Sequence, residues 1–209
     1  MVVILYSYYR KWSEYMKKLL YINGCINPEC SRTDRLAQAY LEKKAASGEY
    51  QIKTLRLADE KNLMPLLWTG LQNRQNAIEQ QDFSSPYFRF ARDFAGADEV
   101  LIACPYWDMS FPSVFKVYLE HLCINGLTFC YDEKGIPRGL TKIKSAVYIT
   151  TAGGYIGENN CGFDYVQKLF SGLFGIRDIR FFSAEGLDIF GNNPEKILAD
   201  AVDKIKQQA

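Results

Sequence analysis

The chain has 209 residues, a length that suits one domain. Of these residues 48% are apolar, 14% aromatic and 23% charged. This composition excludes a disordered chain, a collagen and a coiled coil. Its 25 Lys and Arg residues balance 24 Asp and Glu residues, leaving a net charge of +1. It therefore lacks the excess of cations with which nucleic-acid-binding proteins bind phosphates. No apolar stretch approaches the roughly 20 residues of a membrane-spanning helix, so we expect no membrane segment.

The first 15 residues are unlike the rest of the chain. Their apolar run, residues 2–6, is too short for the core of a signal peptide, and the charged residues Arg10 and Lys11 follow where a cleavage site would stand. Met16 then leads directly into a second apolar run. We therefore predict that residues 1–15 are a dispensable N-terminal extension and that residues 16–209 form the folded domain.

Short apolar runs alternate with helical patterns along that domain. The runs predicted to be strands are residues 19–22, 51–57, 100–104, 146–150 and 179–184. Apolar residues recur with a 3.6-residue period, which predicts helices, over residues 36–45, 114–122, 165–173 and 197–205. Strands that are apolar at nearly every position suit a parallel sheet covered on both faces. The alternation predicts a doubly wound α/β fold, a five-stranded parallel sheet with helices on both faces.

Two segments are longer than simple connections between a strand and a helix. Residues 61–86 include Met64, Trp68 and a Gln/Asn-rich stretch, and residues 123–141 include two glycine turns. Such segments form lids, pocket walls or subunit contacts, and the composition does not choose among these.

The loop after the first predicted strand ends in Ser31, Arg32 and Thr33, at the start of a predicted helix. Free backbone N–H groups and the helix dipole favour an anion there, and the two hydroxyls and the guanidinium add donors. The alternative is a plain helix cap, since Ser and Thr are favoured at that position in any case. The loop is neither a P-loop nor a dinucleotide fingerprint, because the chain has no GxxxxGK[ST] and no Gly-x-Gly.

The loops after the third and fourth predicted strands are also unusual. The first of these carries Pro105, Tyr106, Trp107, Asp108 and Met109, and the second carries Thr151, Ala152, Gly153, Gly154 and Tyr155. Aromatic side chains at a sheet edge suit a flat conjugated ligand, although they also serve to cover the end of a sheet. Paired glycines allow a backbone to approach a ring closely, although they also form ordinary turns.

Parallel strands place their carboxyl-terminal loops at one edge, where open α/β sheets bind their ligands. An anion cradle, an aromatic strip and a glycine-rich loop at that edge together describe a phosphate joined to a flat ring. FMN has that shape, so we predict an FMN site formed by these three loops.

On these residues the chain resembles the flavodoxin-like NAD(P)H-dependent FMN oxidoreductases, in particular the FMN-dependent NADH-azoreductase and quinone reductase family. The resemblance covers nearly all of residues 17–209. It is carried by Ser31-Arg32-Thr33, Pro105-Tyr106-Trp107-Asp108-Met109 with Phe115-Lys116-Val117-Tyr118, Gly126-Leu127-Thr128-Phe129 with Gly139-Leu140, Thr151-Ala152-Gly153-Gly154, and Phe182-Ser183-Ala184-Glu185-Gly186.

The resemblance implies both a site and an activity. Residues 31–33 would hold the FMN phosphate, residues 106–109 would edge the isoalloxazine, and residues 151–154 would line its pyrimidine side. The implied enzyme is a homodimer that uses NADH or NADPH to reduce a quinone, azo or nitroaromatic acceptor by a ping-pong mechanism. Azoreductases often carry Asn where this chain has Asp108, which is a candidate relay for a proton to the reduced acceptor.

A flavodoxin-type electron carrier without its own small-molecule substrate is the alternative. Carriers of that type tend to be strongly acidic because they dock by charge, whereas this chain is neutral, and its long segments suit a walled pocket. A flavin-free binding module is a further alternative, although it would have little use for Tyr106 and Trp107 opposite the paired glycines.

The cysteines indicate neither a metal site nor a disulfide scaffold. They are six, scattered and without a Cys-x-x-Cys spacing, and the single histidine, His121, is expected to be structural. We expect no bound metal and reduced thiols in a cytoplasmic protein. The six cysteines are Cys25, Cys30, Cys104, Cys123, Cys130 and Cys161.

Overall fold

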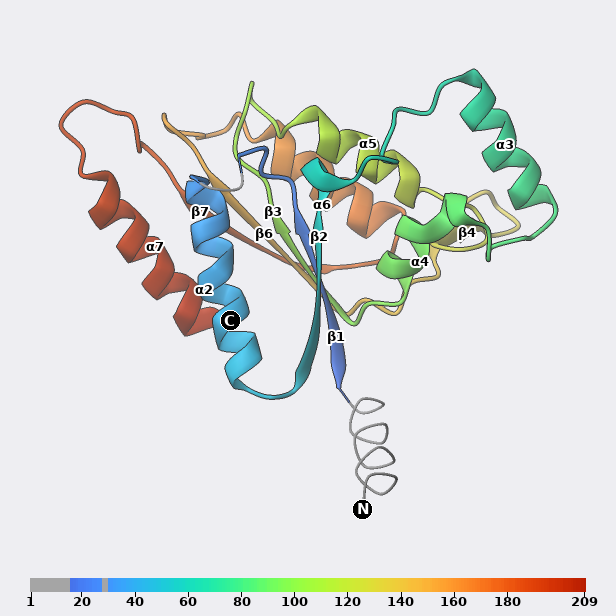
Figure 1. The fold of residues 1–209 in the computed structure, drawn as a ribbon, viewed down its shortest axis with the longest axis horizontal. Helices are drawn as coiled ribbons and strands as arrows, with labels where there is room; N and C mark the ends of the chain where they lie inside the picture. Colours follow the sequence, from blue (N-terminus) through green and yellow to red (C-terminus); the bar gives the residue numbers. More distant parts are fainter. Residues whose placement is uncertain (1–15, 28–29) are drawn as a thin grey trace, which may run out of the picture.

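The computed structural model of the chain describes residues 16–27 and 30–209; the prediction about residues 1–15 lies outside the described residues. A parallel sheet with the order β2-β1-β3-β6-β7 forms the centre of the molecule (Figure 1). Its strands are β1 (Lys17–Asn23), β2 (Tyr50–Arg56), β3 (Glu99–Ala103), β6 (Ser145–Thr151) and β7 (Asp178–Ala184). The predicted five-stranded sheet is confirmed, with each strand within two residues of its predicted bounds.

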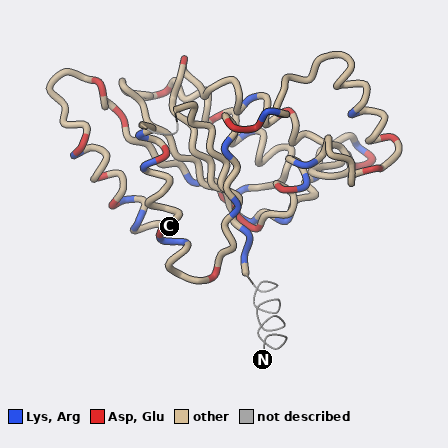
Figure 2. Tube along the Cα trace, viewed as in Figure 1, with Lys and Arg blue, Asp and Glu red and all other residues tan. Residues whose placement is uncertain are grey.

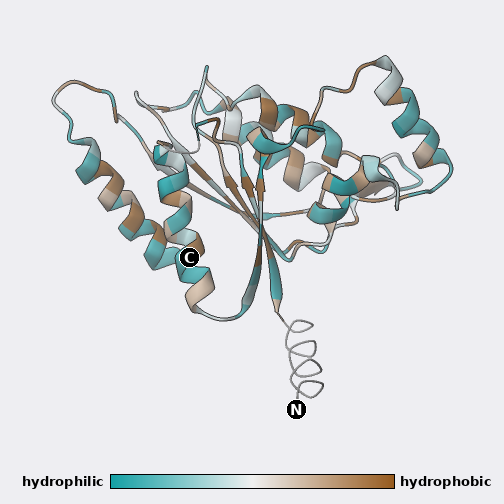
Figure 3. Cartoon of the chain, in the orientation of Figure 1, coloured by the Kyte–Doolittle hydropathy of each residue, from teal (hydrophilic) through white to brown (hydrophobic). Residues whose placement is uncertain are grey.

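Helices cover both faces of the sheet, as predicted (Figure 1). On one face lie α2 (Arg32–Ala46) and α7 (Pro194–Gln208), and on the other lie α4 (Arg89–Ala95), α5 (Ser113–Leu122) and α6 (Cys161–Gly172). Each face has its own apolar core, the first including Leu36 and Ile205 and the second Phe115 and Phe170. Figure 3 shows that the middle of the sheet is mostly hydrophobic, while the helices alternate between hydrophobic and hydrophilic residues. The edge strand β2 also carries polar residues, and only one of its positions is buried.

The central strand β3 is buried at every position. Its register aligns its carboxyl end with those of its neighbours, with Asn23 of β1 opposite Ala103 and Ile149 of β6 also opposite Ala103. The chain order reverses between β1 and β3, which is the switch point at which open α/β sheets form a crevice. The loops after β1, β3 and β6 therefore leave the sheet side by side.

The two long segments form elements that the sequence analysis did not predict. Residues 61–86 contain α3 (Trp68–Glu79), and residues 123–141 contain an antiparallel hairpin of β4 (Phe129–Tyr131) and β5 (Pro137–Gly139). Short 3₁₀ turns, η1 (Leu57–Asp59) and η2 (Pro86–Phe88), flank the first segment. The helix α4 was not predicted either, because its seven residues are too few to show a period.

The helix α3 extends away from the rest of the fold (Figure 1) and has no buried residue. Its C-terminal half is anchored, since Ala77 and Ile78 pack against a small cluster around Phe88. The Arg74 guanidinium also donates to the Glu120 carbonyl at 3.3 Å, near the C-terminal end of α5. In its N-terminal half, the Asn73 amide donates to the Tyr87 hydroxyl at 3.0 Å.

Charges of both signs are interspersed over the helices (Figure 2), in keeping with the neutral composition. None of the helices in residues 16–27 and 30–209 is long and apolar enough to cross a membrane.

Candidate functional site

Backbone hydrogen bonds continue the sheet beyond the ends of its strands and join the three predicted loops. The Gly24 N–H donates to the Ala103 carbonyl at 2.8 Å, which joins the loop after β1 to the end of β3. The Tyr106 N–H donates to the Thr151 carbonyl at 3.0 Å, which joins the loop after β3 to the end of β6. The structure thus brings the three loops together at one edge.

The helix α2 begins at this edge. Ser31 is its N-cap, and its hydroxyl accepts from the Asp34 N–H at 3.1 Å. The N–H groups of Arg32 and Thr33, in the first turn of a 15-residue helix, have no partner within the helix and carry the positive end of its dipole. The cap and the anion cradle, which the sequence left as alternatives, are therefore compatible, because the Ser31 hydroxyl can accept from Asp34 and still donate its own proton.

Asp34, which the sequence analysis missed, holds this helix start against β1. Its carboxylate is buried and accepts from the Asn23 amide at 2.9 Å, from the Gln38 amide at 3.1 Å and from the Tyr21 hydroxyl. A buried carboxylate is stabilised only when it is paired or hydrogen-bonded in this way. The only sequence signal was an acidic residue in the first helical turn.

Thr33 is turned away from solvent. Its side chain is 1% exposed, and its hydroxyl shares a 2.6 Å hydrogen bond with the Thr151 hydroxyl, which is also buried. This contact ties the start of α2 to the end of β6, so that the first and third loops are fixed relative to each other.

The first two loops also approach closely at Gly24. A Cβ atom at this position would lie 2.4 Å from the Cys104 sulfur, so only glycine fits. Cys104 is fully buried, and burial raises the pKa of its thiol well above the usual range. Burial likewise raises the pKa of Cys25 to about 11. Both thiols therefore remain protonated near neutral pH and act as packing residues here.

The loop after β3 forms a tight turn with two residues in the left-handed region. The Trp107 N–H donates to the Ser110 carbonyl at 3.1 Å and the Ser110 N–H to the Trp107 carbonyl at 2.7 Å. Between them Asp108 has φ 49° and Met109 has φ 66°, which is the pattern of a type I′ turn. Such turns favour Asn-Gly, so a methionine in this conformation is strained.

This turn presents apolar surface at the edge of the sheet. Trp107 and Met109 are each 49% exposed, and Asp108 is also exposed. Tyr106 instead crosses to the third loop, where its hydroxyl donates to the Asn159 carbonyl at 2.8 Å. Pro105 is half-buried at the base of the loop. The aromatic strip predicted from the sequence is thus divided into one bridging and one exposed side chain.

The loop after β6 is supported by a fourth loop, the one after β7, which the sequence analysis did not place in the site. The Asp188 N–H donates to the Gly153 carbonyl at 2.9 Å, and the Gly186 N–H to the Gly154 carbonyl at 2.8 Å. Ala152 is buried and Tyr155 is 70% exposed. A Cβ atom at Gly153 would lie 2.3 Å from Asp188 Oδ2. The absence of a side chain at Gly153 therefore leaves room for the Asp188 carboxylate.

Asp188 in turn pairs with Arg32. The guanidinium donates through Nη1 at 2.8 Å and through Nη2 at 3.2 Å, one bond to each carboxylate oxygen. These hydrogen bonds, with the charge of Arg32, lower the pKa of Asp188 below its usual value. The two residues are 156 positions apart, and no sequence pattern connects them.

The groups at this edge fit a phosphate ester attached to a planar ring. The helix start and the Ser31 hydroxyl are phosphate donors, and Trp107 and Met109 offer an apolar surface. Within residues 16–27 and 30–209, no hydrogen bond occupies the N–H groups of Asp108, Met109, Gly153 and Gly154, which leaves them free for the polar rim of a ring.

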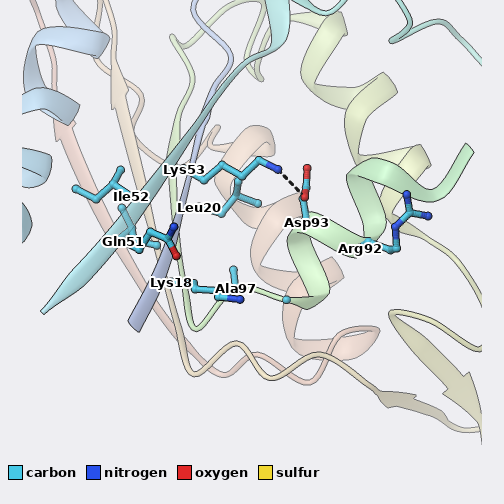
Figure 4. Close-up of a pocket in the computed structure, with 10 residues that line it drawn as sticks. Lys18, Leu20, Gln51, Ile52, Lys53, Arg92, Asp93 and Ala97 are labelled. Atoms are coloured by element: carbon cyan, nitrogen blue, oxygen red, sulfur yellow. Dashed lines mark ion pairs between the residues drawn. The ribbon is translucent and has the colours of Figure 1, made fainter. Parts of the chain in front are cut away.

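A separate cavity of about 460 Å³ lies near the amino ends of β1 and β2, far along the strands from these loops. It is lined by Lys18, Gln51 and Lys53, with Asp93 from α4 (Figure 4). The Lys53 ammonium and the Asp93 carboxylate form an ion pair of 2.6 Å beside it. This cavity does not contain any of the predicted site residues.

The histidine and the cysteines considered in the sequence analysis lie outside any metal site in the described residues. The His121 ring nitrogen Nε2 lies 2.8 Å from the Met64 carbonyl oxygen, and the ring packs edge-on against Phe90. All six cysteines are free. In the described part of the chain, no group of three or more His, Cys, Asp and Glu side chains is placed to hold a metal ion.

The chain is similar to known proteins over most of its length. The model of a family described by its flavodoxin-like fold matches residues 17–209. Among solved structures, an azoreductase from Bacillus anthracis superposes with a TM-score of 0.81 at 22% identity, covering 92% of this chain and 98% of that one. An FMN-dependent NADH-azoreductase from the same species, solved in complex with FMN, gives a TM-score of 0.78 at 22% identity, covering 92% and 97%. These similarities show the fold.

Curated relatives are similar at higher identity over their whole length. The FMN-dependent NADH:quinone oxidoreductase of Clostridium beijerinckii is 35% identical over 198 residues, which cover 93% of this chain and 98% of the relative. The protein of the same name from Coprothermobacter proteolyticus is 35% identical over 205 residues, again covering 93% and 98%. The chain therefore belongs to the flavodoxin-like family that includes these FMN-dependent NADH:quinone oxidoreductases.

Proposed function

We propose that the chain is an FMN-dependent oxidoreductase that passes two electrons from NADH to a quinone or azo acceptor. The observation that carries this proposal is the convergence of a helix start, an exposed apolar turn and a glycine loop at the switch point of the sheet. Relatives that this chain matches over 98% of their own length are named FMN-dependent NADH:quinone oxidoreductases. A bound FMN supplies the redox chemistry by accepting and donating electrons in pairs.

The protein's part is to bind and orient the cofactor. We assign the phosphate to the Ser31 hydroxyl, the Arg32 guanidinium and the backbone N–H of Thr33, at the positive end of α2. The turn at residues 105–109 provides an apolar surface and two free N–H groups for the ring. Residues 151–155 line its pyrimidine side with the N–H groups of the paired glycines.

Binding and turnover can be tested separately. Addition of the purified protein should quench FMN fluorescence and retain the flavin through gel filtration, and the loaded protein should oxidise NADH rapidly only when a quinone is present. A protein that binds FMN but oxidises no NADH with any acceptor would instead be an electron carrier. Failure to bind FMN would refute the proposal.

We further propose that Asp108 carries a proton to the reduced acceptor. Its exposed carboxylate lies on the turn beside Trp107 and Met109. Asp108→Asn keeps the tolerance for positive φ, since Asn adopts this conformation as readily as Asp. The variant should slow the reduction of the acceptor. The reduction of the bound flavin by NADH, monitored as the loss of the flavin's yellow colour, should proceed at the wild-type rate. Equal slowing of both half-reactions would exclude the relay.

We propose that two copies associate through the exposed face of α3 and the segment before it. Met64, Leu67 and Trp68 are 62%, 74% and 71% exposed, a concentration of large apolar side chains that soluble monomers rarely leave uncovered. Light scattering should give twice the mass of the chain for the wild type and the monomer mass for Trp68→Glu. Phe190→Glu, at an exposed phenylalanine in the loop after β7, should remain dimeric. A monomeric wild type would refute the assignment.

We place the enzyme in the cytoplasm, where reduced thiols persist. All six cysteines are free, and Cys25 and Cys104 are buried beside the site. Fractionation of the cells should recover the protein with other cytoplasmic enzymes.

A further inference from the structure

The ion pair between Arg32 and Asp188 is positioned where the cofactor phosphate would bind. Both terminal nitrogens of the guanidinium are engaged by the carboxylate, at 2.8 and 3.2 Å. The two side chains are 40% and 64% exposed, and ion pairs with this exposure contribute little to stability. Stability therefore does not explain why a second loop brings a carboxylate to the start of α2.

The two partners differ in how firmly they are held. Asp188 is fixed, because its N–H is bonded to the Gly153 carbonyl at 2.9 Å and its carboxylate lies against Gly153, where no Cβ would fit. The loop that carries it is held further by the bond from the Ile156 N–H to the Glu185 carboxylate at 2.9 Å. Arg32, by contrast, is a long side chain at the first position of α2, and no other ion pair in the described chain restrains it.

We propose that Asp188 is a counter-ion that competes with the FMN phosphate for Arg32 and so weakens the binding of the cofactor. This inference rests on the proposed function. In the free protein the carboxylate neutralises Arg32. When the phosphate binds, the flexible guanidinium turns to it, and the fixed Asp188 is left as an unpaired negative charge beside a dianion.

The size of the effect follows from Coulomb's law in a solvent-exposed site. Two like charges several ångströms apart in a high effective dielectric, screened by salt, change a binding constant by about three- to tenfold. The effect requires the phosphate charge, so a flavin without a phosphate should not respond to it.

The test compares FMN with riboflavin, which lacks the phosphate. Dissociation constants are measured by quenching of flavin fluorescence for the wild type and for Asp188→Asn at low and high salt. We expect the variant to bind FMN about three- to tenfold more tightly at low salt, with a smaller gain at high salt and no gain for riboflavin. The matched control is Asp200→Asn, which removes an exposed carboxylate paired with Lys196 at 2.8 Å on α7 and should leave FMN affinity unchanged.

A second variant separates competition from positioning. Asp188→Ala removes the hydrogen bonds as well as the charge, and it should also tighten FMN binding if Asp188 competes for Arg32. Weaker FMN binding by both variants would show that Asp188 orients Arg32 and would overturn the proposal. Unchanged FMN affinity with a flavin-binding wild type would overturn this inference alone, whereas a wild type that binds no FMN would overturn the proposed function together with it.

Discussion

Met109 occupies the left-handed region with φ 66° in the turn at the edge of the site. For a residue with a side chain this conformation costs roughly 1–2 kcal/mol, a cost that glycine does not have. Met109→Gly should therefore increase the free energy of unfolding by about 1 kcal/mol, measured by urea denaturation. It should also weaken FMN binding, because the exposed apolar side chain is lost. Met64→Gly, at an exposed position without positive φ, should not stabilise the protein.

Tyr118 is buried in α5, and its hydroxyl has no hydrogen-bond partner in the described chain. Its ring packs edge-on against Phe90. Tyr118→Phe keeps the ring and removes the unsatisfied hydroxyl, whose burial costs about 1–3 kcal/mol. The variant should therefore be at least as stable as the wild type at pH 7. A loss of more than about 1 kcal/mol would show that the hydroxyl has a partner.

The same tyrosine predicts a response to alkali. Burial raises the pKa of Tyr118 above its usual value of about 10. Above pH 10 the unfolded chain loses this proton while the folded chain keeps it, so the free energy of unfolding falls as the pH rises, by about 1.4 kcal/mol per pH unit for each such group. Denaturation midpoints measured from pH 9 to 11 should fall less steeply for Tyr118→Phe than for the wild type. Parallel curves would contradict the assignment.

The contact between the loops after β1 and β3 depends on Gly24 and Cys104. Gly24→Ala would place a methyl group 2.4 Å from the Cys104 sulfur and should reduce stability by about 1–3 kcal/mol through overpacking. In the double variant Gly24→Ala/Cys104→Ala the sulfur is gone, and the remaining Cβ lies at an ordinary 3.7 Å from the new methyl. The double variant should therefore be no less stable than Cys104→Ala alone. A double-mutant cycle of urea denaturation measures this non-additivity.

The elements that the sequence predicted are those in which local pattern and tertiary environment agree. β3 is apolar at four of five positions and buried at all of them, and the stripes of α2 and α7 face the sheet. The helix α3 escaped prediction because its apolar residues do not form a buried stripe. By contrast, the hydrogen bonds of Thr33 and Tyr106 and the ion pair of Asp188 join segments that are distant in the sequence. No local sequence pattern predicts such contacts.

The family match begins at residue 17, which is also the first residue of β1. Deletion of residues 1–15 should leave the urea midpoint and the quenching of FMN fluorescence unchanged. Deletion of residues 1–20 is the control, because it removes the buried Leu19 and Leu20 and over half of a strand paired on both sides, and it should abolish folding. Equal damage by both deletions would refute the assignment of the extension as dispensable.

The bonds from Gly186 and Asp188 to the glycine loop have a consequence for the order of events during biosynthesis. A nascent polypeptide emerges from the ribosome with its amino end first, so the helix start at Ser31 is available long before the segment that braces Gly153 has been translated. The crevice reaches its final form only when nearly all 209 residues have been made. We therefore expect flavin uptake to follow translation of this segment, and we expect chains truncated before Gly186 to lack the completed crevice.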